Sequence, residues 1–257
     1  MKRAALAALL LCGSPANAAT DPLYALYAKG AYEAAMRAGV AAGSATGYAV
    51  AARAALADAA LRPAPCLDCL KRAENFARRA IAADPGLADG QVWLAAALGY
   101  ESRLTGLIRA KLRGAPDEAK AALDAALKDD PANPYALAAL GGWNVEIVHV
   151  GGAYLADHLY GASEAAGLAL FDRAVHAAPG NVAVHYQVAL SLAGFDADAY
   201  RARVIRELEA ATAATPATSY ERSMQGRAGE LAALLRRSDE QSDDEFAALL
   251  HRYQGYP

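Results

Sequence analysis

A CxxC motif, Cys66-Leu67-Asp68-Cys69, is the clearest chemical feature of this sequence. It follows Pro63 and Pro65 and stands at the predicted start of a helix. In an oxidising compartment the two thiols can close a short disulfide, and in the reduced state the helix N-terminus would stabilise a thiolate. The motif therefore allows two interpretations, a structural disulfide that holds a helical turn and a site of thiol–disulfide exchange.

The residues around Cys66 and Cys69 favour the structural disulfide. Thioredoxin-like catalysis places this motif in a βαβ unit, and the flanking sequence does not read as one. A covalent haem site needs a histidine directly after the second cysteine, where this chain has Leu70. A structural zinc site needs four ligands, and no histidine is close enough in the sequence to join the pair. We therefore expect a disulfide, no cofactor and no metal.

Other catalytic patterns are not found in the sequence. Glu146 and His149 lie one helical turn apart and offer two metal ligands, but no third ligand is spaced to join them, which favours a surface ion pair. The chain has no Ser-His-Asp order, no glycine-rich phosphate loop and no His-Glu-x-x-His string. These observations predict a protein that is not an enzyme.

Aromatic and charged side chains suggest a binding surface instead. The chain has 13 Tyr against 4 Phe, and tyrosine combines a large apolar face with a polar tip, which suits the wall of a groove. The alternative is that most tyrosines are partly buried spacers between repeats, and that the charges of the segment 101–113 form the solvated face of an amphipathic helix. The candidate groove residues are Tyr100, Arg103, Arg109, Trp143, Glu146 and Tyr154.

The helices that must position these side chains are indicated by a spacing of mostly small residues that ends on proline. Small residues four and three positions apart share one helix face, so a second helix can approach closely there, and the proline stops the helix. This pattern predicts stacked helical hairpins and an all-α fold. It occurs as Ala73, Ala77, Ala80 and Pro85; Ala119, Leu123, Ala126 and Pro131; Gly167, Phe171, Ala174 and Pro179; and Val204, Leu208, Ala211 and Pro216.

Each closing proline defines a pair of helices. The intervals between the prolines are 46, 48 and 37 residues, so the middle units contain insertions, at 104–115 and 151–162, where we expect any specific function to lie. A further helix is predicted over 29–43, and the tail 219–257 is predicted to form capping helices that end the array, the last one starting near 243. The predicted first helices are 47–61, 88–113, 135–150 and 182–192, and the second helices are 69–83, 116–128, 163–177 and 198–214.

The pattern resembles the tetratricopeptide repeat, which has a period of about 34 residues. The resemblance covers roughly residues 23–218 and includes Leu94, Leu98, Leu140 and Gly141 on first helices. Two departures are clear, because tryptophan is not at its usual place and two repeats carry about a dozen extra residues. The resemblance implies a right-handed α-solenoid that works as a binding module.

The middle unit also resembles the helical repeat core of the regulator of microtubule dynamics family. The shared order is a Gly-x-Trp start at Gly141 to Trp143, a long helix, a Leu-aromatic-Gly step at Leu159 to Gly161, and a second helix that contains Phe171. This match covers about forty residues and supports the fold rather than an activity.

The first residues have the order of a secretory signal peptide. Basic residues at 2–3 precede the apolar run 4–12, and a small-residue A-x-A cleavage site follows at 16–18. We therefore expect residues 1–18 to be removed and residues 19–257 to form one helical domain in the periplasm.

Charge and hydropathy exclude two classes of partner. Without the signal peptide, 23 Lys and Arg face 28 Asp and Glu, a net charge of −5 with no basic tract, which is not the composition of a nucleic-acid-binding protein. The longest later apolar stretch, 136–162, contains Glu146, His149, Asp157 and His158, so we expect no transmembrane segment.

The sequence thus predicts an exported binding or scaffold protein that recognises a protein or peptide in a groove lined by first helices. One alternative is a small-ligand carrier resembling the periplasmic helical T-component of tripartite transporters, because the inserted helices could close one side of the groove. An enclosed apolar pocket would favour that carrier, whereas an open concave face would not. A thiol–disulfide enzyme that uses Cys66 and Cys69 is the third possibility.

Overall fold

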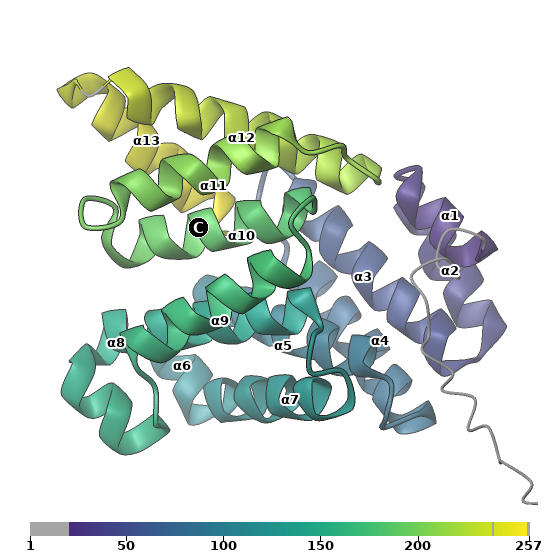
Figure 1. Cartoon of the computed structure of the whole chain (residues 1–257). Helices are drawn as coiled ribbons and strands as arrows, with labels where there is room; N and C mark the ends of the chain where they lie inside the picture. Colours follow the sequence, from purple (N-terminus) through teal and green to yellow (C-terminus); the bar gives the residue numbers. More distant parts are fainter. Residues whose placement is uncertain (1–20, 238, 256–257) are drawn as a thin grey trace, which may run out of the picture.

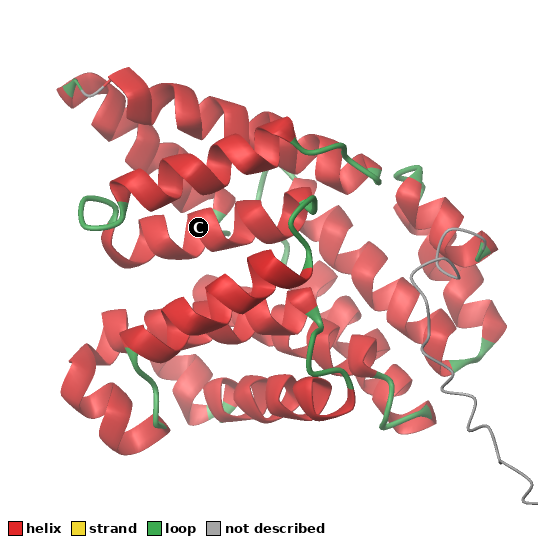
Figure 2. Cartoon of the chain, in the orientation of Figure 1, coloured by secondary structure: helices red, strands yellow, loops and turns green. Residues whose placement is uncertain are grey.

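Helices make up the fold of the computed structural model, which describes residues 21–237 and 239–255 (Figures 1 and 2). The described residues form thirteen helices and no strand, which confirms the all-α prediction. The signal peptide predicted at 1–18 lies outside the described residues. The helices are α1 (Pro22–Ala28), α2 (Tyr32–Ala42), α3 (Ala45–Leu61), α4 (Leu67–Ala83), α5 (Ala88–Thr105), α6 (Leu107–Leu112), α7 (Ala115–Asp129), α8 (Pro134–Tyr160), α9 (Glu164–Ala177), α10 (Val182–Asp196), α11 (Arg201–Ala213), α12 (Ser219–Arg237) and α13 (Glu240–Tyr253).

The residues of the proline-ended pattern lie on buried helix faces, as predicted. All twelve of the residues that precede the prolines are buried, and Ala73, Phe171 and Ala211 have no exposed surface. Helices α8 and α9 approach especially closely, because a Cβ atom placed on Gly167 would lie 3.1 Å from the Gly141 carbonyl oxygen. Small residues on both helices therefore permit the contact, as the spacing suggested.

Two predicted first helices differ from the observed ones because glycines interrupt them. The helix predicted over 88–113 is two helices, α5 and α6, separated by Gly106 with φ +89°. Helix α8 continues to Tyr160, beyond the predicted end at 150, and bends at Gly152 with φ +73°. A positive φ is unfavourable for residues with a side chain, so glycine is the residue that permits both interruptions. The two insertions thus form α6 and the second half of α8.

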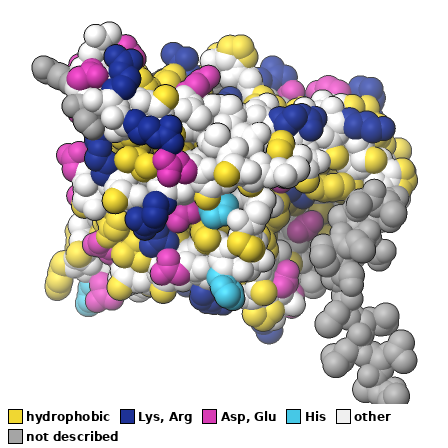
Figure 3. All heavy atoms as spheres, turned by 45° about the horizontal axis from the view of Figure 1, so that its top comes forward, with side chains coloured by type: hydrophobic (Ala, Val, Ile, Leu, Met, Phe, Trp, Pro, Cys, Tyr) yellow, Lys and Arg dark blue, Asp and Glu magenta, His cyan; other side chains and the backbone are white. Residues whose placement is uncertain are grey.

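The first helices of successive hairpins contact one another. Helix α3 packs against α5, α5 against α8, and α8 against α10, while α4, α7, α9 and α11 each pack against the first helix of their own pair. No helix among the described residues is long and apolar enough to cross a membrane. On the face shown in Figure 3, basic and acidic side chains are interspersed and form no continuous basic surface.

The C-terminal helices contact several earlier helices. Helix α12 packs on α11 and α10 and also contacts α1, and α13 packs on α12 and α10 (Figure 1). The Gln254 side-chain amide donates to the Leu190 carbonyl of α10 at 3.0 Å, and the Gln254 carbonyl lies 3.5 Å from Nη1 of Arg103 on α5. The end of the described chain therefore lies against α5 and α10. Helix α13 also starts earlier than predicted, because the Asp239 side chain caps it.

Candidate ligand-binding site

Arg53 of α3 lies among four aromatic rings from three other helices. Its guanidinium carbon is 5.4 Å from the ring centre of Tyr24 and 4.7 Å from that of Tyr27, both on α1. The corresponding distances to Trp93 on α5 and Tyr135 on α8 are 5.0 and 5.1 Å. A cation within about 6 Å of a ring centre is attracted to the ring face. We call these five residues the aromatic box.

Arg53 lies on a helix that is mostly buried, so its side chain needs partners in the protein interior. It is the single charged residue between 45 and 57, in a helix whose other residues are mostly alanine and mostly buried. Its Nη2 donates a hydrogen bond of 3.1 Å to the Tyr135 hydroxyl, which also accepts a bond of 2.9 Å from the Asn181 amide. The guanidinium is therefore held by rings and by one oriented hydroxyl.

The aromatic box carries a positive charge without a direct counter-ion. Among the described residues, no carboxylate oxygen lies within 4.0 Å of Arg53. Burial raises the pKa of Tyr27 to about 12, so this ring is uncharged at neutral pH. Asp89 acts on Arg53 only from a longer distance; burial raises the pKa of this carboxyl, although the Arg53 charge opposes the shift. Trp93 is only 9% exposed, and its indole N–H has no hydrogen-bond partner in the described structure.

A cavity of about 200 Å³ adjoins the aromatic box. Its walls come from α1, α3, α5, α7, α8, α10 and α12 and include small residues such as Ala96, Gly99 and Ala139, which leave the space unfilled. Arg103 and Glu146 lie elsewhere along its wall and form a two-pronged ion pair, with N–O distances of 2.7 and 3.2 Å. This cavity therefore combines an unpaired cation with a neutralised charge pair.

A second cavity, of about 320 Å³, lies among α5, α6, α7 and α8. It is lined mainly by apolar side chains, among them Leu98, Ile147 and Leu155. Its nearby polar groups bind one another, because the Trp143 indole donates to the Pro116 carbonyl at 3.0 Å and Lys111 donates to the Tyr160 hydroxyl. The two cavities share four lining residues, Gly99, Ala119, Trp143 and Glu146, and are thus neighbours.

The structure brings together four of the six predicted groove residues. Tyr100, Arg103, Trp143 and Glu146 all line the first cavity. The other two do not line either cavity. Arg109 is exposed on α6, and Tyr154 is 79% exposed on α8, where its ring stacks on His158.

The predicted ion pair between Glu146 and His149 is wrong. Glu146 binds Arg103 instead, and Nδ1 of His149 lies 3.1 Å from the Phe195 carbonyl oxygen. The one-turn spacing indicated a common helix face correctly, but each side chain binds a group on a neighbouring helix instead.

The aromatic box itself was missed by the sequence analysis. Its members come from α1, α3, α5 and α8 and span residues 24 to 135, so no local spacing joins them. One signal was present. A lone arginine inside an otherwise uncharged, alanine-rich helix has to be accommodated in the protein interior by specific partners.

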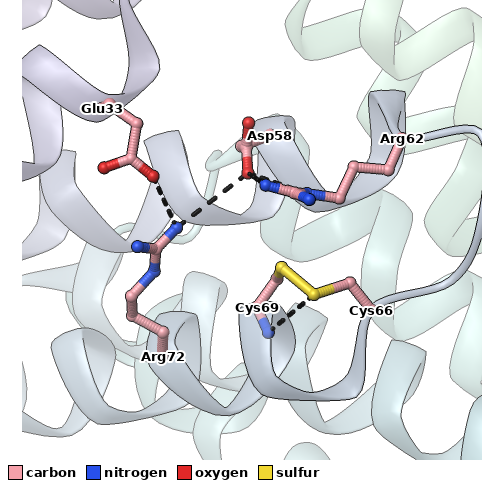
Figure 4. Close-up of a disulfide and its surroundings, with 6 residues drawn as sticks. All are labelled: Glu33, Asp58, Arg62, Cys66, Cys69 and Arg72. Carbon is pink, nitrogen blue, oxygen red and sulfur yellow. Dashed lines mark hydrogen bonds and ion pairs between the residues drawn. A yellow bond between two sulfur atoms is a disulfide. The ribbon is translucent and has the colours of Figure 1, made fainter.

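The sulfur atoms of Cys66 and Cys69 are at bonding distance, which agrees with the predicted disulfide (Figure 4). Sγ of Cys66 also accepts a hydrogen bond of 3.2 Å from the Cys69 N–H and so caps α4. Figure 4 shows Arg72 beside the pair, bound to Glu33 at 3.0 Å. Neither cysteine lines either of the two cavities.

Replacing both cysteines by serine is expected to lower the free energy of unfolding by about 1 to 2 kcal/mol, because the disulfide closes only a short loop. The hydroxyl at position 66 keeps the cap, so the matched variant Cys66→Ala with Cys69→Ala should lose about 1 kcal/mol more. Urea unfolding followed by circular dichroism measures both values. Loss of ligand binding or cellular function in the folded serine variant would instead indicate reactive thiols.

Within the described residues, no three His, Cys, Asp or Glu side chains are grouped so that they could hold a metal ion. No model of a known protein family matches the chain, and no significant match is found among curated proteins. The geometry of the two cavities is thus the basis for the function proposed below.

Proposed function

We propose that the protein binds a small ligand between its first helices α3, α5, α8 and α10 and acts by binding rather than by catalysis. The observation that carries this proposal is the aromatic box, in which the unpaired Arg53 charge borders a cavity walled by several helices. Specific polar groups in a mostly apolar cavity are the usual features of a small-molecule site. The C-terminal segment around Gln254 lies against α5 and α10 and so covers part of the surface that a peptide in a groove of first helices would contact.

We further propose that the hairpins form a right-handed tetratricopeptide-like solenoid whose enlarged middle units close around the ligand. The order of contacts from α3 through α5 and α8 to α10 supports this arrangement. Export to the periplasm after removal of residues 1–18 remains part of the proposal. A disulfide between Cys66 and Cys69 suits an oxidising compartment of this kind.

A protein or peptide partner is the second candidate, and a different surface supports it. The two insertions expose large apolar side chains that a monomer has little reason to expose together. Ile108 and Leu112 on α6 are 80% and 83% exposed, and Leu159 on α8 is 59% exposed. Leu159 also lines the second cavity, whereas Ile108 and Leu112 line neither cavity, so substitutions at Ile108 or Leu112 separate the two candidates.

Native mass spectrometry of the protein purified from its own periplasm tests the proposal. We expect a bound small molecule that is released on denaturation. The variant Gly99→Leu should lose it, because both cavities border this position and a Cβ atom placed there meets no atom within 4 Å, so the added side chain has room to enter the space of the ligand. Gly226→Leu on α12 is the matched control, since that position is also open but lies at the surface.

The outcomes distinguish the two candidates. A ligand lost from Gly99→Leu but kept by Gly226→Leu and by Ile108→Asp supports the cavity. If the native protein carries no small molecule and instead crosslinks to a protein in a manner that Ile108→Asp abolishes, the cavity proposal is wrong and the exposed insertion surface is the functional site.

A further inference from the structure

We propose that the ligand is a carboxylate with a long apolar chain, whose carboxylate binds Arg53 in the aromatic box and whose chain enters the apolar cavity between α5 and α8. This inference rests on the proposed small-ligand function and adds its chemical class. The argument for the charged end and the argument for the apolar end use different residues.

We infer a charged end of the ligand because the buried charge of Arg53 is only partly compensated. A buried charge is costly unless an opposite charge or hydrogen bonds compensate it, and the four rings and the Tyr135 hydroxyl compensate only part of this cost. Part of the side chain still borders the cavity. The planar guanidinium matches a carboxylate with two parallel hydrogen bonds. The unpartnered indole N–H of Trp93 supplies a further buried donor beside it.

Neither Asp89 nor Glu146, the acidic residues near the cavity, forms an ion pair with Arg53. Asp89 is farther than 4.0 Å from Arg53, and Glu146 is paired with Arg103 at 2.7 Å. That ion pair removes the repulsion that a free Glu146 would exert on an anionic ligand. An incoming carboxylate therefore meets a positive charge at Arg53 that, among the described residues, has no carboxylate within 4.0 Å.

The apolar end follows from the positions of the cavities along two helices. From Trp93 to Gly99 helix α5 advances about 9 Å, and from Tyr135 to Trp143 helix α8 advances about 12 Å, at 1.5 Å per residue. The first residue of each pair belongs to the aromatic box, and the second lines both cavities. A ligand anchored at Arg53 must therefore extend by about 10 Å before it reaches the apolar cavity, which requires a long chain.

The second cavity has the surface that such a chain prefers. Its apolar walls include Ile147, Val150 and Leu159, and its polar neighbours are bound to one another. Transfer of a chain from water into it would contribute about 0.8 kcal/mol for each buried CH₂ group. The first cavity, at about 200 Å³, is smaller than the about 300 Å³ at which small-molecule sites usually begin, and the second, at about 320 Å³, only just reaches that size. The two together exceed it clearly.

The chain has two tryptophans, Trp93 in the aromatic box and Trp143 at the boundary of the cavities, so intrinsic fluorescence reports on both regions. The full mature protein, freed of endogenous ligand, is titrated with laurate, lauryl alcohol and acetate. We expect laurate to bind at least tenfold more tightly than either of the others. Arg53→Met should weaken laurate binding at least tenfold and leave lauryl alcohol binding unchanged.

Arg79→Met is the matched control. Arg79 also stacks on a tyrosine, 4.1 Å from the ring centre of Tyr48, and donates to its hydroxyl, but it lines neither cavity. This variant should bind laurate like the wild type. If Arg53→Met does not fold, Gly99→Leu provides the second test, since it should weaken laurate binding at least tenfold and leave acetate binding unchanged.

Equal affinity for laurate and lauryl alcohol, or wild-type laurate affinity in folded Arg53→Met, would overturn the assignment of the charged end. Equal affinity for laurate and acetate would overturn the assignment of the chain. If native mass spectrometry recovers a ligand that Gly99→Leu loses while laurate does not bind, this inference fails and the proposed function stands. If neither a native ligand nor any probe binds, both fail.

Discussion

Replacing Phe171 by alanine is expected to lower the free energy of unfolding by about 3 to 5 kcal/mol. The ring has no exposed surface and fills the contact between α8 and α9. A Cβ atom placed on Gly141 would lie only 2.6 Å from it, so the ring rests directly on the α8 backbone. The close backbone approach of Gly141 and Gly167 limits further collapse, and the space left by the ring would remain as a cavity. Urea unfolding measured by circular dichroism gives the value.

Tyr154→Ala is the matched control for the loss of an aromatic ring. Tyr154 is 79% exposed on the second half of α8, and its removal should change the free energy of unfolding by less than about 0.5 kcal/mol. A loss below about 1 kcal/mol in Phe171→Ala would mean that the proline-ended pattern does not identify the residues that hold adjacent helices together.

The Phe171 position was predictable because helix pairing in this protein is encoded locally. Residues at spacings of four and three fix one face of a helix, and a proline fixes its end, so Gly167 and Phe171 could be assigned to a contact before the partner helix was known. The breaks at Gly106 and Gly152 were harder to predict. A glycine inside a helical pattern is compatible with both a continuous helix and a break, and tertiary packing decides between them.

The candidate site could be predicted only in part for the same reason. Tyr100, Arg103 and Trp143 lie on long first helices, and the repeat resemblance implied that such helices form the inner wall. The aromatic box depends on which distant rings meet Arg53, and helical periodicity contains no information about contacts between helices such as that of Arg53 with Tyr135, 82 positions away. The contact of the C-terminal segment with α5 and α10 was missed. The predicted capping helices were placed at the end of the sequence, but the sequence does not show which surfaces they cover.

Replacing His185 by leucine is expected to lower the free energy of unfolding by about 3 kcal/mol, since it leaves Glu207 buried without its closest partner. His185 is 4% exposed, and its Nδ1 lies 2.7 Å from Oε2 of Glu207. Its Nε2 lies 2.9 Å from the carbonyl of Pro179, the proline that ends α9. Both neighbours are acceptors, so the protonated imidazole, which donates from both nitrogens, satisfies the site. Arg203 remains near Glu207 at 3.8 Å and limits the loss.

The same contacts predict how stability depends on pH. The hydrogen bond to Glu207 raises the pKa of His185 in the folded state above its usual 6.5. As the pH rises, the folded protein therefore keeps a proton on His185 that the unfolded chain loses. The contribution of this proton to the free energy of unfolding is complete below about pH 6.5 and disappears as the pH rises through the raised pKa. Burial raises the pKa of Glu101 from 4.5 to about 7. For the same reason the free energy of unfolding also falls as the pH rises between these two values.

A comparison of variants isolates the His185 contribution. We expect the free energy of unfolding to fall from pH 6 to pH 9 more steeply in the wild type than in His185→Gln, because the amide donates a hydrogen bond without titrating. Chemical unfolding at closely spaced pH values measures this difference, and the Glu101 contribution cancels in it. His176→Gln is the control, since His176 is exposed on α9 and should follow the wild-type curve. Parallel curves for the wild type and His185→Gln would show that the folded state does not hold a proton on His185, and that the link between α9, α10 and α11 depends on neutral hydrogen bonds instead.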